Sequence, residues 1–317
     1  MPHTSNTARP MPDIAHGAHT VATGTLDWVG MGDIALPIRV AARAGEFVQT
    51  PARVAAFVNL QQPQARGIHM SRLYLLLDRV LASAELTPAL LQRVLGEFVA
   101  SQRELSSRAM LRIAFDCLLR RPALVSANSG WKAYPVVITA VLDERGFALE
   151  TAFEVTYSST CPSSAALARQ LIQEQFKADF APDGLDFDRV LTWLGSEQGI
   201  NATPHAQRSG AEVCVRMRPD ALTFPLLALI DRVEGALMTP VQTAVKREDE
   251  QAFARLNGAN LMFCEDAARR IQHALDRDEG ITDFWLRASH YESLHAHNAV
   301  AIATKGVAGG YDALTKL

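Results

Sequence analysis

The chain has 317 residues, of which 48% are hydrophobic and 21% charged, so it is long enough for two domains and apolar enough to bury a sizeable core. Its 31 basic and 34 acidic residues give a formal charge of -3, which supplies no general field for nucleic acid. Since apolar runs such as 224–230 fall far short of the ~20 residues that cross a bilayer, we expect a globular protein that binds neither nucleic acid nor membrane.

Residues 1–24 predict a flexible N-terminal tail, because they are rich in His, Thr, Ala and Pro and lack periodicity. This stretch has no basic start followed by an apolar run, the pattern of a secretory signal. The four cysteines are scattered and none lies in a C-x-x-C pair, which is typical of a reducing compartment. We therefore expect a cytoplasmic protein.

The first predicted module covers residues 25–145 and has the order strand, strand, helix, helix, strand, strand. Alternating or continuous apolar runs predict its strands, at 34–41, 53–60, 111–115 and 134–142. Apolar stripes at helical spacing predict its helices, one over Leu73 to Leu81 and one over Leu90 to Phe98. Thr87 as N-cap and Pro88 in the first turn open the second helix.

The second predicted module, residues 146–317, repeats this order. The expected strands lie at 147–157, 211–217, 283–290 and 298–304, and the expected helices at 224–237 and 265–275. A segment at about 168–202, which includes an amphipathic helix, interrupts the repeat as an insertion. The fold class is therefore α+β, with two tandem ββααββ modules whose antiparallel sheets are covered by helix pairs.

Six short segments at junctions between these elements carry reactive or charged side chains, and junctions are where a scaffold commonly presents chemistry. They are Arg66 to Arg72 (R-G-I-H-M-S-R), Thr160 to Ser164 (T-C-P-S-S), His205 to Ser209 (H-A-Q-R-S), Lys246 to Glu250 (K-R-E-D-E), Cys264 to Asp266 (C-E-D) and Glu292 to His297 (E-S-L-H-A-H).

Each segment alone has an ordinary structural interpretation. A lone cysteine such as Cys161 is most often a small buried hydrophobe, and a carboxylate such as Glu265 in a first turn complements a helix terminus. Lys246 and Arg247 suit a solvated face. His295 is two residues from His297, so the two share a face only in extended chain.

Together the segments indicate a metal site and a polyphosphate ligand. Sulfur, nitrogen and carboxylate ligands are the set that zinc and its borderline neighbours take, and Cys161, His205 and Glu250 could supply it. Basic clusters on an otherwise mildly acidic protein suit a polyphosphate. The candidates for that contact are Arg66, Arg72, Arg208, Lys246 and Arg247, with His69 and Ser71 as hydrogen-bond donors.

In this combination and order the six motifs resemble the type IB GTP cyclohydrolase (FolE2) family of the tunnelling-fold (T-fold) superfamily, over about residues 25–305. The resemblance implies a metal-dependent conversion of GTP and water to 7,8-dihydroneopterin triphosphate and formate. This reaction is the first step towards tetrahydrofolate and, in many bacteria, towards deazaguanine-modified tRNA bases. It also implies one divalent metal (Zn, Mn or Fe(II)) per active site and a homotetramer with active sites built between subunits.

Carried over motif by motif, the resemblance implies metal ligation by Cys161, His205 and Glu250, guanine recognition by Glu265, and catalytic roles for Cys161 and His295. One departure is Ser163, which stands where the family usually has a second cysteine, and the insertion at about 168–202 is another.

Two alternatives stay open from the sequence. The first is a nitrile reductase of the same superfold, which would leave His205, Glu250 and the basic clusters unexplained. The second is a non-catalytic protein that binds purine nucleotides, for which Ser163 is the only hint.

Overall fold

The computed structural model describes residues 22–43, 46–314 and 316, so most of the predicted N-terminal tail lies outside the described residues. The chain divides into two compact units. The first runs up to Phe115 and adds Val137–Glu150 and Pro219–Phe224, while the second comprises Asp116–Val136, Thr151–Arg218 and Pro225–Leu317. These units are defined by contacts in space, whereas the modules predicted at 25–145 and 146–317 are defined by the repeated order of elements along the chain. The boundaries of the two modules therefore stay predictions.

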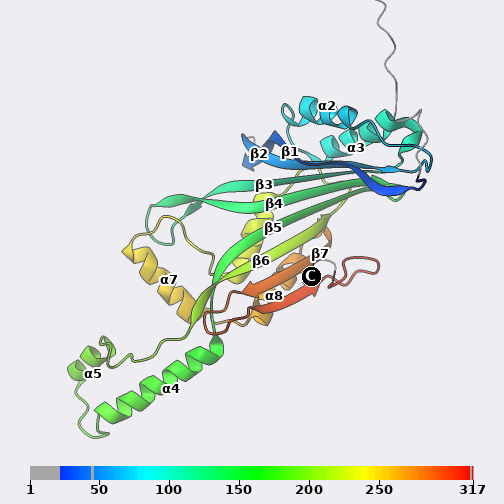
Figure 1. Ribbon diagram of the computed structural model, residues 1–317. Coiled ribbons are helices and arrows are strands. Elements are labelled where there is room, and N and C mark those ends of the chain that lie inside the picture. The colour runs from blue at the N-terminus through cyan, green and yellow to red at the C-terminus, as the bar shows by residue number, and fades with distance from the viewer. Residues whose placement is uncertain (1–21, 44–45, 315, 317) are drawn as a thin grey trace, which may run out of the picture. The chain divides into compact units, whose positions relative to one another are not determined.

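Eight strands form one antiparallel sheet in which each strand pairs with the next in the sequence (Figure 1). They are β1 (Leu26–Arg43), β2 (Glu46–Leu60), β3 (Ala109–Pro122), β4 (Ser129–Asp143), β5 (Gly146–Thr160), β6 (Ala206–Met217), β7 (Ile281–His290) and β8 (Ala299–Thr304). Seven of them contain the strands predicted from periodicity and are longer, because their ends carry polar residues that the apolar pattern misses. The eighth, β8, begins one residue after the predicted start at 298. The α+β fold with two ββααββ repeats is confirmed.

The helices described fall into the two expected pairs and four further elements. They are α2 (Met70–Leu81), α3 (Pro88–Gln102), the 3-10 turn η1 (Arg103–Leu105), α4 (Pro162–Asp179), α5 (Phe187–Leu194), α6 (Leu226–Leu237), α7 (Arg247–Ala259) and α8 (Cys264–Asp276). The expected pairs are α2 with α3 and α6 with α8. Helix α7 stands between the two helices of the second repeat and was not predicted. None of the helices described is both long enough and apolar enough to span a membrane.

In the first unit, α2 and α3 bury the stripes that predicted them. Leu73 and Leu77 of α2, and Leu91 and Val94 of α3, are fully shielded from solvent. The predicted N-cap of α3 is confirmed, because Thr87 Oγ1 accepts a hydrogen bond from the backbone N–H of Leu90 at 3.2 Å.

In the second unit, α8 packs against α6, β7 and β8. Ile271 of α8 and Val233 of α6 are fully buried, as are Phe284 and Leu286 of β7. Burial of these apolar faces is what holds the helix pair on the sheet, since apolar area removed from water stabilises by roughly 25 cal/mol per Å².

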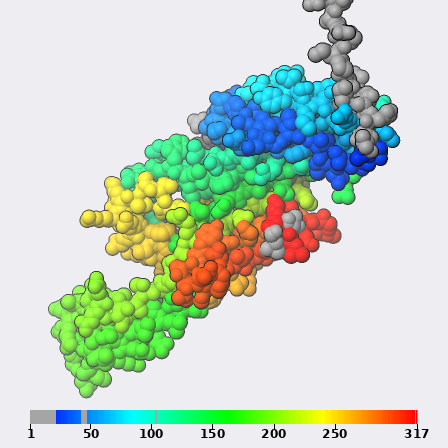
Figure 2. All heavy atoms as spheres, in the orientation of Figure 1, coloured from blue at the N-terminus to red at the C-terminus, as the bar shows by residue number. Residues whose placement is uncertain are grey.

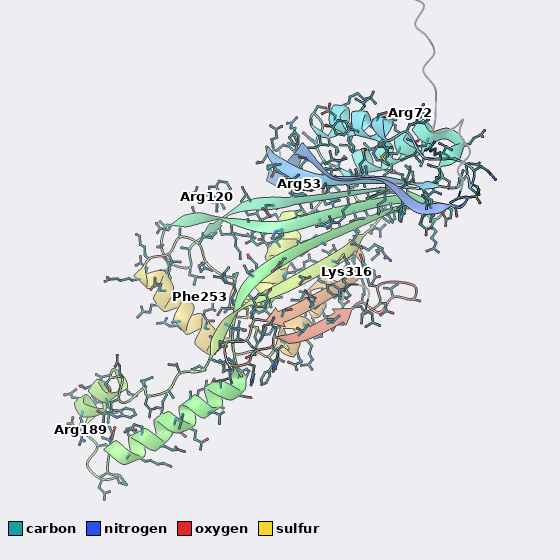
Figure 3. All side chains as sticks on the ribbon, in the orientation of Figure 1. Arg53, Arg72, Arg120, Arg189, Phe253 and Lys316 are labelled. Atoms are coloured by element: carbon teal, nitrogen blue, oxygen red, sulfur yellow. The ribbon has the colours of Figure 1, made fainter. Side chains whose placement is uncertain are left out.

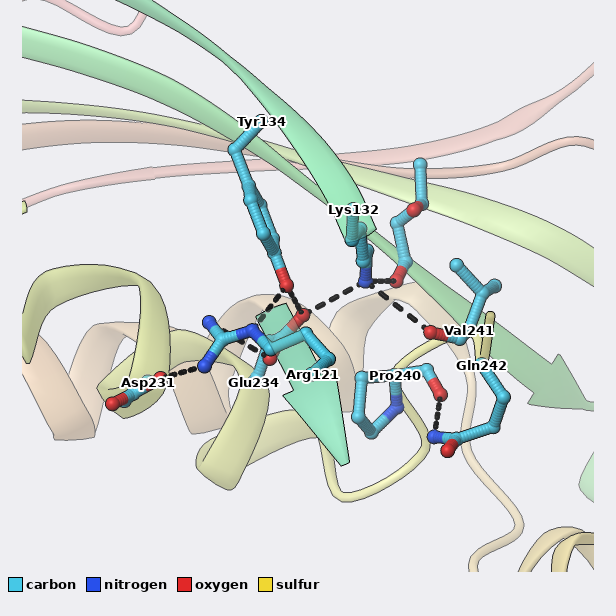
Figure 4. Close-up of polar contacts among 9 residues, drawn as sticks. Arg121, Lys132, Tyr134, Asp231, Glu234, Pro240, Val241 and Gln242 are labelled. Atoms are coloured by element: carbon cyan, nitrogen blue, oxygen red, sulfur yellow. Dashed lines mark hydrogen bonds and ion pairs between the residues drawn. The ribbon is translucent and has the colours of Figure 1, made fainter. Parts of the chain in front are cut away.

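A buried network of opposite charges also joins α6 to β3 and β4 (Figure 4). Glu234 of α6 accepts hydrogen bonds from Lys132 Nζ at 2.8 Å and from the Tyr134 hydroxyl at 2.7 Å. Arg121 of β3 donates to the same hydroxyl at 2.7 Å and pairs with Asp231 at 2.5 Å. Burial lowers the pKa of Lys132, against the opposing effect of Glu234. The cost of burying these charges is offset because each has a partner of opposite sign.

Helices α4 and α5 form an arm, residues 162–204, that leaves the end of β5 and returns to the start of β6 (Figures 1 and 2). At its tip, the rings of Phe176, Phe180 and Trp193 pack with centroids 4.8 to 5.8 Å apart, and Trp193 Nε1 donates to Asp179 at 2.7 Å. Arg189 lies on α5 (Figure 3). The arm exposes seven large apolar side chains, Leu167, Leu171, Leu185, Phe187, Leu191, Leu194 and Ile200.

Candidate active site

Cys161 and His205 meet where the arm joins the sheet. Cys161 follows the last residue of β5 and is the N-cap of α4, whose first position is Pro162. His205 directly precedes β6. Because β5 and β6 are neighbours in the sheet, the two ends of the arm are held together, and the Cys161 N–H donates to the His205 carbonyl at 3.3 Å. The structure therefore brings two of the three predicted metal ligands to one place.

Ser164 fixes both of these residues. Its backbone N–H donates to Cys161 Sγ at 3.5 Å, which caps the first turn of α4. Its hydroxyl accepts from the His205 N–H at 3.1 Å. Cys161 and His205 are both half-buried, so each side chain is anchored at the backbone and reachable from solvent.

Glu250, the third predicted ligand, is exposed in the first turn of α7. Its neighbour Asp249 is fully buried and ties this helix end to the loop between β3 and β4. The Asp249 carboxylate accepts from the backbone N–H groups of Val125 and Ser126, each at 2.8 Å, and from the Ser126 hydroxyl at 2.6 Å. It also accepts from the Lys246 N–H at 2.8 Å, which completes a capping box. The position of Glu250 is thus set by Asp249, which sequence reasoning left without a role.

Replacement of Asp249 by Asn is expected to lower the melting temperature at neutral pH. The hydrogen bonds from Ser126 and Lys246 hold the pKa of the Asp249 carboxyl well below its usual range. A depressed folded-state pKa gives stability that is present above the unfolded value of ~3.9 and is lost as the pH falls below it. Thermal unfolding between pH 3 and 7 should therefore show a gap between wild type and Asp249→Asn that shrinks in acid.

The exposed Glu248 on the same turn offers the matched control, and Glu248→Gln should melt close to wild type throughout. An Asp249→Asn variant with an unchanged melting temperature at pH 7 would contradict the anchoring role of this carboxylate.

Within the described part of the chain, no three His, Cys, Asp or Glu side chains are grouped closely enough to hold a metal ion. Cys161 and His205 fit a borderline metal by donor chemistry, since thiolate and imidazole are ligands that zinc and its neighbours accept. The complete set with Glu250 stays a prediction.

Glu265 lies in the first turn of α8, as predicted, and its carboxylate is exposed. The helix terminus is capped by a different residue, because Asp266 Oδ2 accepts from the Phe263 N–H at 3.0 Å. The partner of Glu265 is the buried thiol of Cys264, which donates to Oε2 at 3.3 Å. Burial, and to a smaller extent the hydrogen bond to Glu265, raises the pKa of the Cys264 thiol to about 11. This thiol therefore stays protonated at neutral pH. The ordinary structural interpretation of Glu265 was that its carboxylate complements the N-terminus of a helix. In α8 the capping hydrogen bond is accepted by Asp266 instead.

The buried side chains of His290 and Tyr157 form a hydrogen-bonded pair that was not predicted from the sequence. His290 Nε2 lies 3.0 Å from the Tyr157 hydroxyl, and both side chains are almost completely buried. Burial lowers the pKa of His290 to about 4, while Glu292 and Glu265 act in the opposite direction, so the ring is neutral at pH 7. A single histidine at the end of an apolar strand gives no distinctive signal in the sequence.

His295 lies in the segment between β7 and β8, and its ring stacks on that of His297 with centroids 5.0 Å apart and planes 8° apart. Both side chains are exposed. The two rings thus share a face although residues 293–297 form bends rather than the extended chain that this was expected to require.

The predicted triphosphate contacts are divided between the units. Arg66, His69, Ser71 and Arg72 belong to the first unit, and Arg208, Lys246 and Arg247 to the second. Arg72 is placed on α2 in Figure 3, and its guanidinium donates to the Ser101 carbonyl at 2.5 Å. The five arginine and lysine side chains are exposed.

An eight-stranded antiparallel sheet with paired helices, and a thiol and an imidazole at the root of an arm, define a tunnelling-fold protein with a candidate metal centre. The family described as type I GTP cyclohydrolase FolE2 matches residues 11–301, and this chain belongs to it.

Individual relatives agree with this assignment. GTP cyclohydrolase FolE2 of Pseudoalteromonas translucida (strain TAC 125) is 51% identical over 303 residues, which cover 96% of this chain and 100% of the relative. GTP cyclohydrolase FolE2 of Hydrogenovibrio crunogenus is 49% identical over 95% of this chain and 96% of the relative. A uricase from Bacillus fastidious superposes with a TM-score of 0.50 at 8% identity, over 87% of this chain and 92% of that one, a likeness of fold alone.

Proposed function

We propose that this chain is a metal-dependent GTP cyclohydrolase that converts GTP and water to 7,8-dihydroneopterin triphosphate and formate. Family membership over nearly the whole chain supports the reaction. The observation that carries the proposal is the backbone hydrogen bond from Cys161 to His205, which holds the two residues next to each other where the arm joins the sheet. The product would feed tetrahydrofolate synthesis and deazaguanine-modified tRNA bases.

The cofactor in this proposal is one divalent metal, Zn, Mn or Fe(II), held by Cys161, His205 and Glu250. When bound, such a metal lowers the pKa of water from 15.7 towards ~7 and so supplies hydroxide at neutral pH. The residues of the chain hold the donor atoms in place: Ser164 anchors Cys161 and His205, and Asp249 anchors the helix turn that carries Glu250.

Substrate recognition falls to Glu265 and to the basic side chains. Guanine presents N1–H and the exocyclic amine as adjacent donors, and a carboxylate can accept both. The Glu265 carboxylate is suited to this because it is exposed and does not cap its helix. Arg208, Lys246 and Arg247 are exposed cations in the same unit as Glu265 and suit the triphosphate.

Proton transfer falls to His295. Attack on C8 of the purine ring requires that N7 take up a proton, and imidazole exchanges protons near neutral pH. His295 is exposed in the segment between β7 and β8, so its ring is open to solvent and to a ligand from solvent. The nitrile reductase alternative is not favoured, because the relatives that match over the whole chain are named as GTP cyclohydrolases.

The assembly in this proposal is a homotetramer in the cytoplasm, with active sites completed between subunits. The exposed apolar side chains of the arm support association, since removing apolar area from water on contact with another subunit is favourable. Light scattering on the purified protein is expected to give the mass of four chains. A monodisperse monomer that turns over GTP would refute this assembly.

The experiment that tests the activity is turnover of GTP by chelated protein to which single metals are added back. We expect no turnover without metal and recovery with at least one of Zn²⁺, Mn²⁺ or Fe²⁺, measured as formate and pterin. Equal turnover before and after chelation would remove the metal from the proposal.

A further inference from the structure

The His205 ring is the first member of a chain of hydrogen-bonded side chains that runs inward between β5 and β6. His205 Nδ1 lies 3.0 Å from Gln207 Oε1. Gln207 Nε2 donates to Ser159 Oγ at 2.8 Å, and Ser159 Oγ lies 2.8 Å from Ser209 Oγ. Gln207 is 9% exposed, and both serines are completely buried.

Strand periodicity explains why these residues meet. Gln207 and Ser209 are two apart in β6, so both face the same side of the sheet. Ser159 is next to the last residue of β5, the neighbouring strand. A buried amide is costly unless both of its ends are paired, and here His205 serves the carbonyl end while Ser159 serves the amine end.

The orientation of this amide decides which His205 nitrogen carries the proton. Because Nε2 of Gln207 faces Ser159, Oε1 faces the imidazole. A carbonyl oxygen only accepts, so the proton must be on Nδ1 of His205. A neutral imidazole has one N–H, and its Nε2 therefore keeps a lone pair.

The backbone of His205 is fixed independently, by Cys161 and Ser164. The imidazole ring can still rotate about its side-chain bonds and can carry its proton on either nitrogen. The hydrogen bond between Nδ1 and Gln207 Oε1 restricts both the rotation and the position of the proton.

We propose that Gln207, anchored by Ser159, is a positioning residue that holds His205 as the Nδ1–H tautomer and presents its Nε2 to the metal ion. This rests on the proposed metal-dependent function. Partners of this kind behind a ligating histidine typically change metal affinity by about 10- to 100-fold when they are removed.

The test is titration of chelated protein with Co²⁺ alone, following the thiolate-to-cobalt absorption that reports ligation by Cys161. Gln207→Leu keeps the approximate size of the side chain and removes the acceptor, so we expect Co²⁺ to bind about 10- to 100-fold more weakly. Gln207→Glu retains an acceptor for Nδ1–H and should bind within a few-fold of wild type, although a buried charge lowers its melting temperature. Ser209→Ala, at the far end of the chain of contacts, is the matched control and should bind like wild type.

A purely structural role for Gln207 would make affinity follow stability, so the Glu variant would lose the most. That result, or equal Co²⁺ affinity in wild type and Gln207→Leu, would overturn the inference while leaving the metal site intact. Nitrogen-15 spectra of histidine-labelled metal-free protein should show the proton of His205 on Nδ1, and a proton on Nε2 would also overturn it. Wild type that binds no Co²⁺ would overturn this inference together with the proposed metal site.

Discussion

Replacement of Cys161 by Ala is expected to abolish metal binding and reduce GTP turnover to the level of chelated wild type, while the fold is retained. The variant removes the thiolate and leaves one donor, His205, at the root of the arm. Cys161 Sγ also accepts a weak hydrogen bond from the Ser164 backbone N–H at 3.5 Å, which caps α4. Some loss of stability at the start of α4 therefore accompanies the change. Metal content of the purified variant and its formation of formate are the measurements.

Two further variants separate ligation from capping. Cys161→Ser keeps an acceptor for the Ser164 N–H and should melt close to wild type, yet it should still lack metal and activity. Ser163→Ala alters the exposed neighbour on the first turn of α4 and should retain both. Stoichiometric metal in Cys161→Ala, or in the equivalent His205→Ala, would remove that residue from the ligand set.

Replacement of Glu265 by Gln should lower GTP turnover by at least about tenfold with little change in melting temperature. The amide substitutes a donor for one acceptor oxygen, and that donor would face a donor of guanine. Mismatched buried polar groups typically cost ~1 to 3 kcal/mol, and more where a charge is involved. The loss should be smaller for ITP, which lacks the exocyclic amine and so already lacks one of the two contacts.

Asp266→Ala is the matched control one residue away, because Asp266 rather than Glu265 caps α8 and alanine has no acceptor for the Phe263 N–H. Loss of a cap typically costs about 1 kcal/mol, so this variant should melt at a lower temperature and keep its GTP turnover. Full activity in Glu265→Gln, or equal losses with GTP and ITP, would exclude Glu265 from recognition of the base.

Helix α7 shows where sequence periodicity stops being informative about the fold. The other helices of the two repeats were predicted because each buries an apolar stripe, as Leu229 and Val233 do in α6. Among the described side chains of α7, only Asp249 is buried, and polar contacts with the β3–β4 loop hold the helix in place. Such contacts join residues more than 120 positions apart and leave no periodic signal.

The candidate site was predictable to the extent that its residues form short motifs. Cys161, His205 and Glu265 were selected by residue type and order, and the structure places the first two in contact. No role was predicted for Gln207 or Ser159, although Gln207 belongs to the same motif as His205 and Ser159 lies two residues before Cys161. Their importance depends on the pairing of β5 with β6, which no single segment encodes.

GTP labelled with carbon-13 at C8 provides the most direct measurement of the central claim. The proposed reaction opens the imidazole ring and releases C8 as formate. With metal-loaded protein, we predict one labelled formate for each GTP consumed, together with an equal amount of unlabelled pterin triphosphate. GTP that is consumed while the label stays in a purine, or that loses only phosphate, would contradict the account.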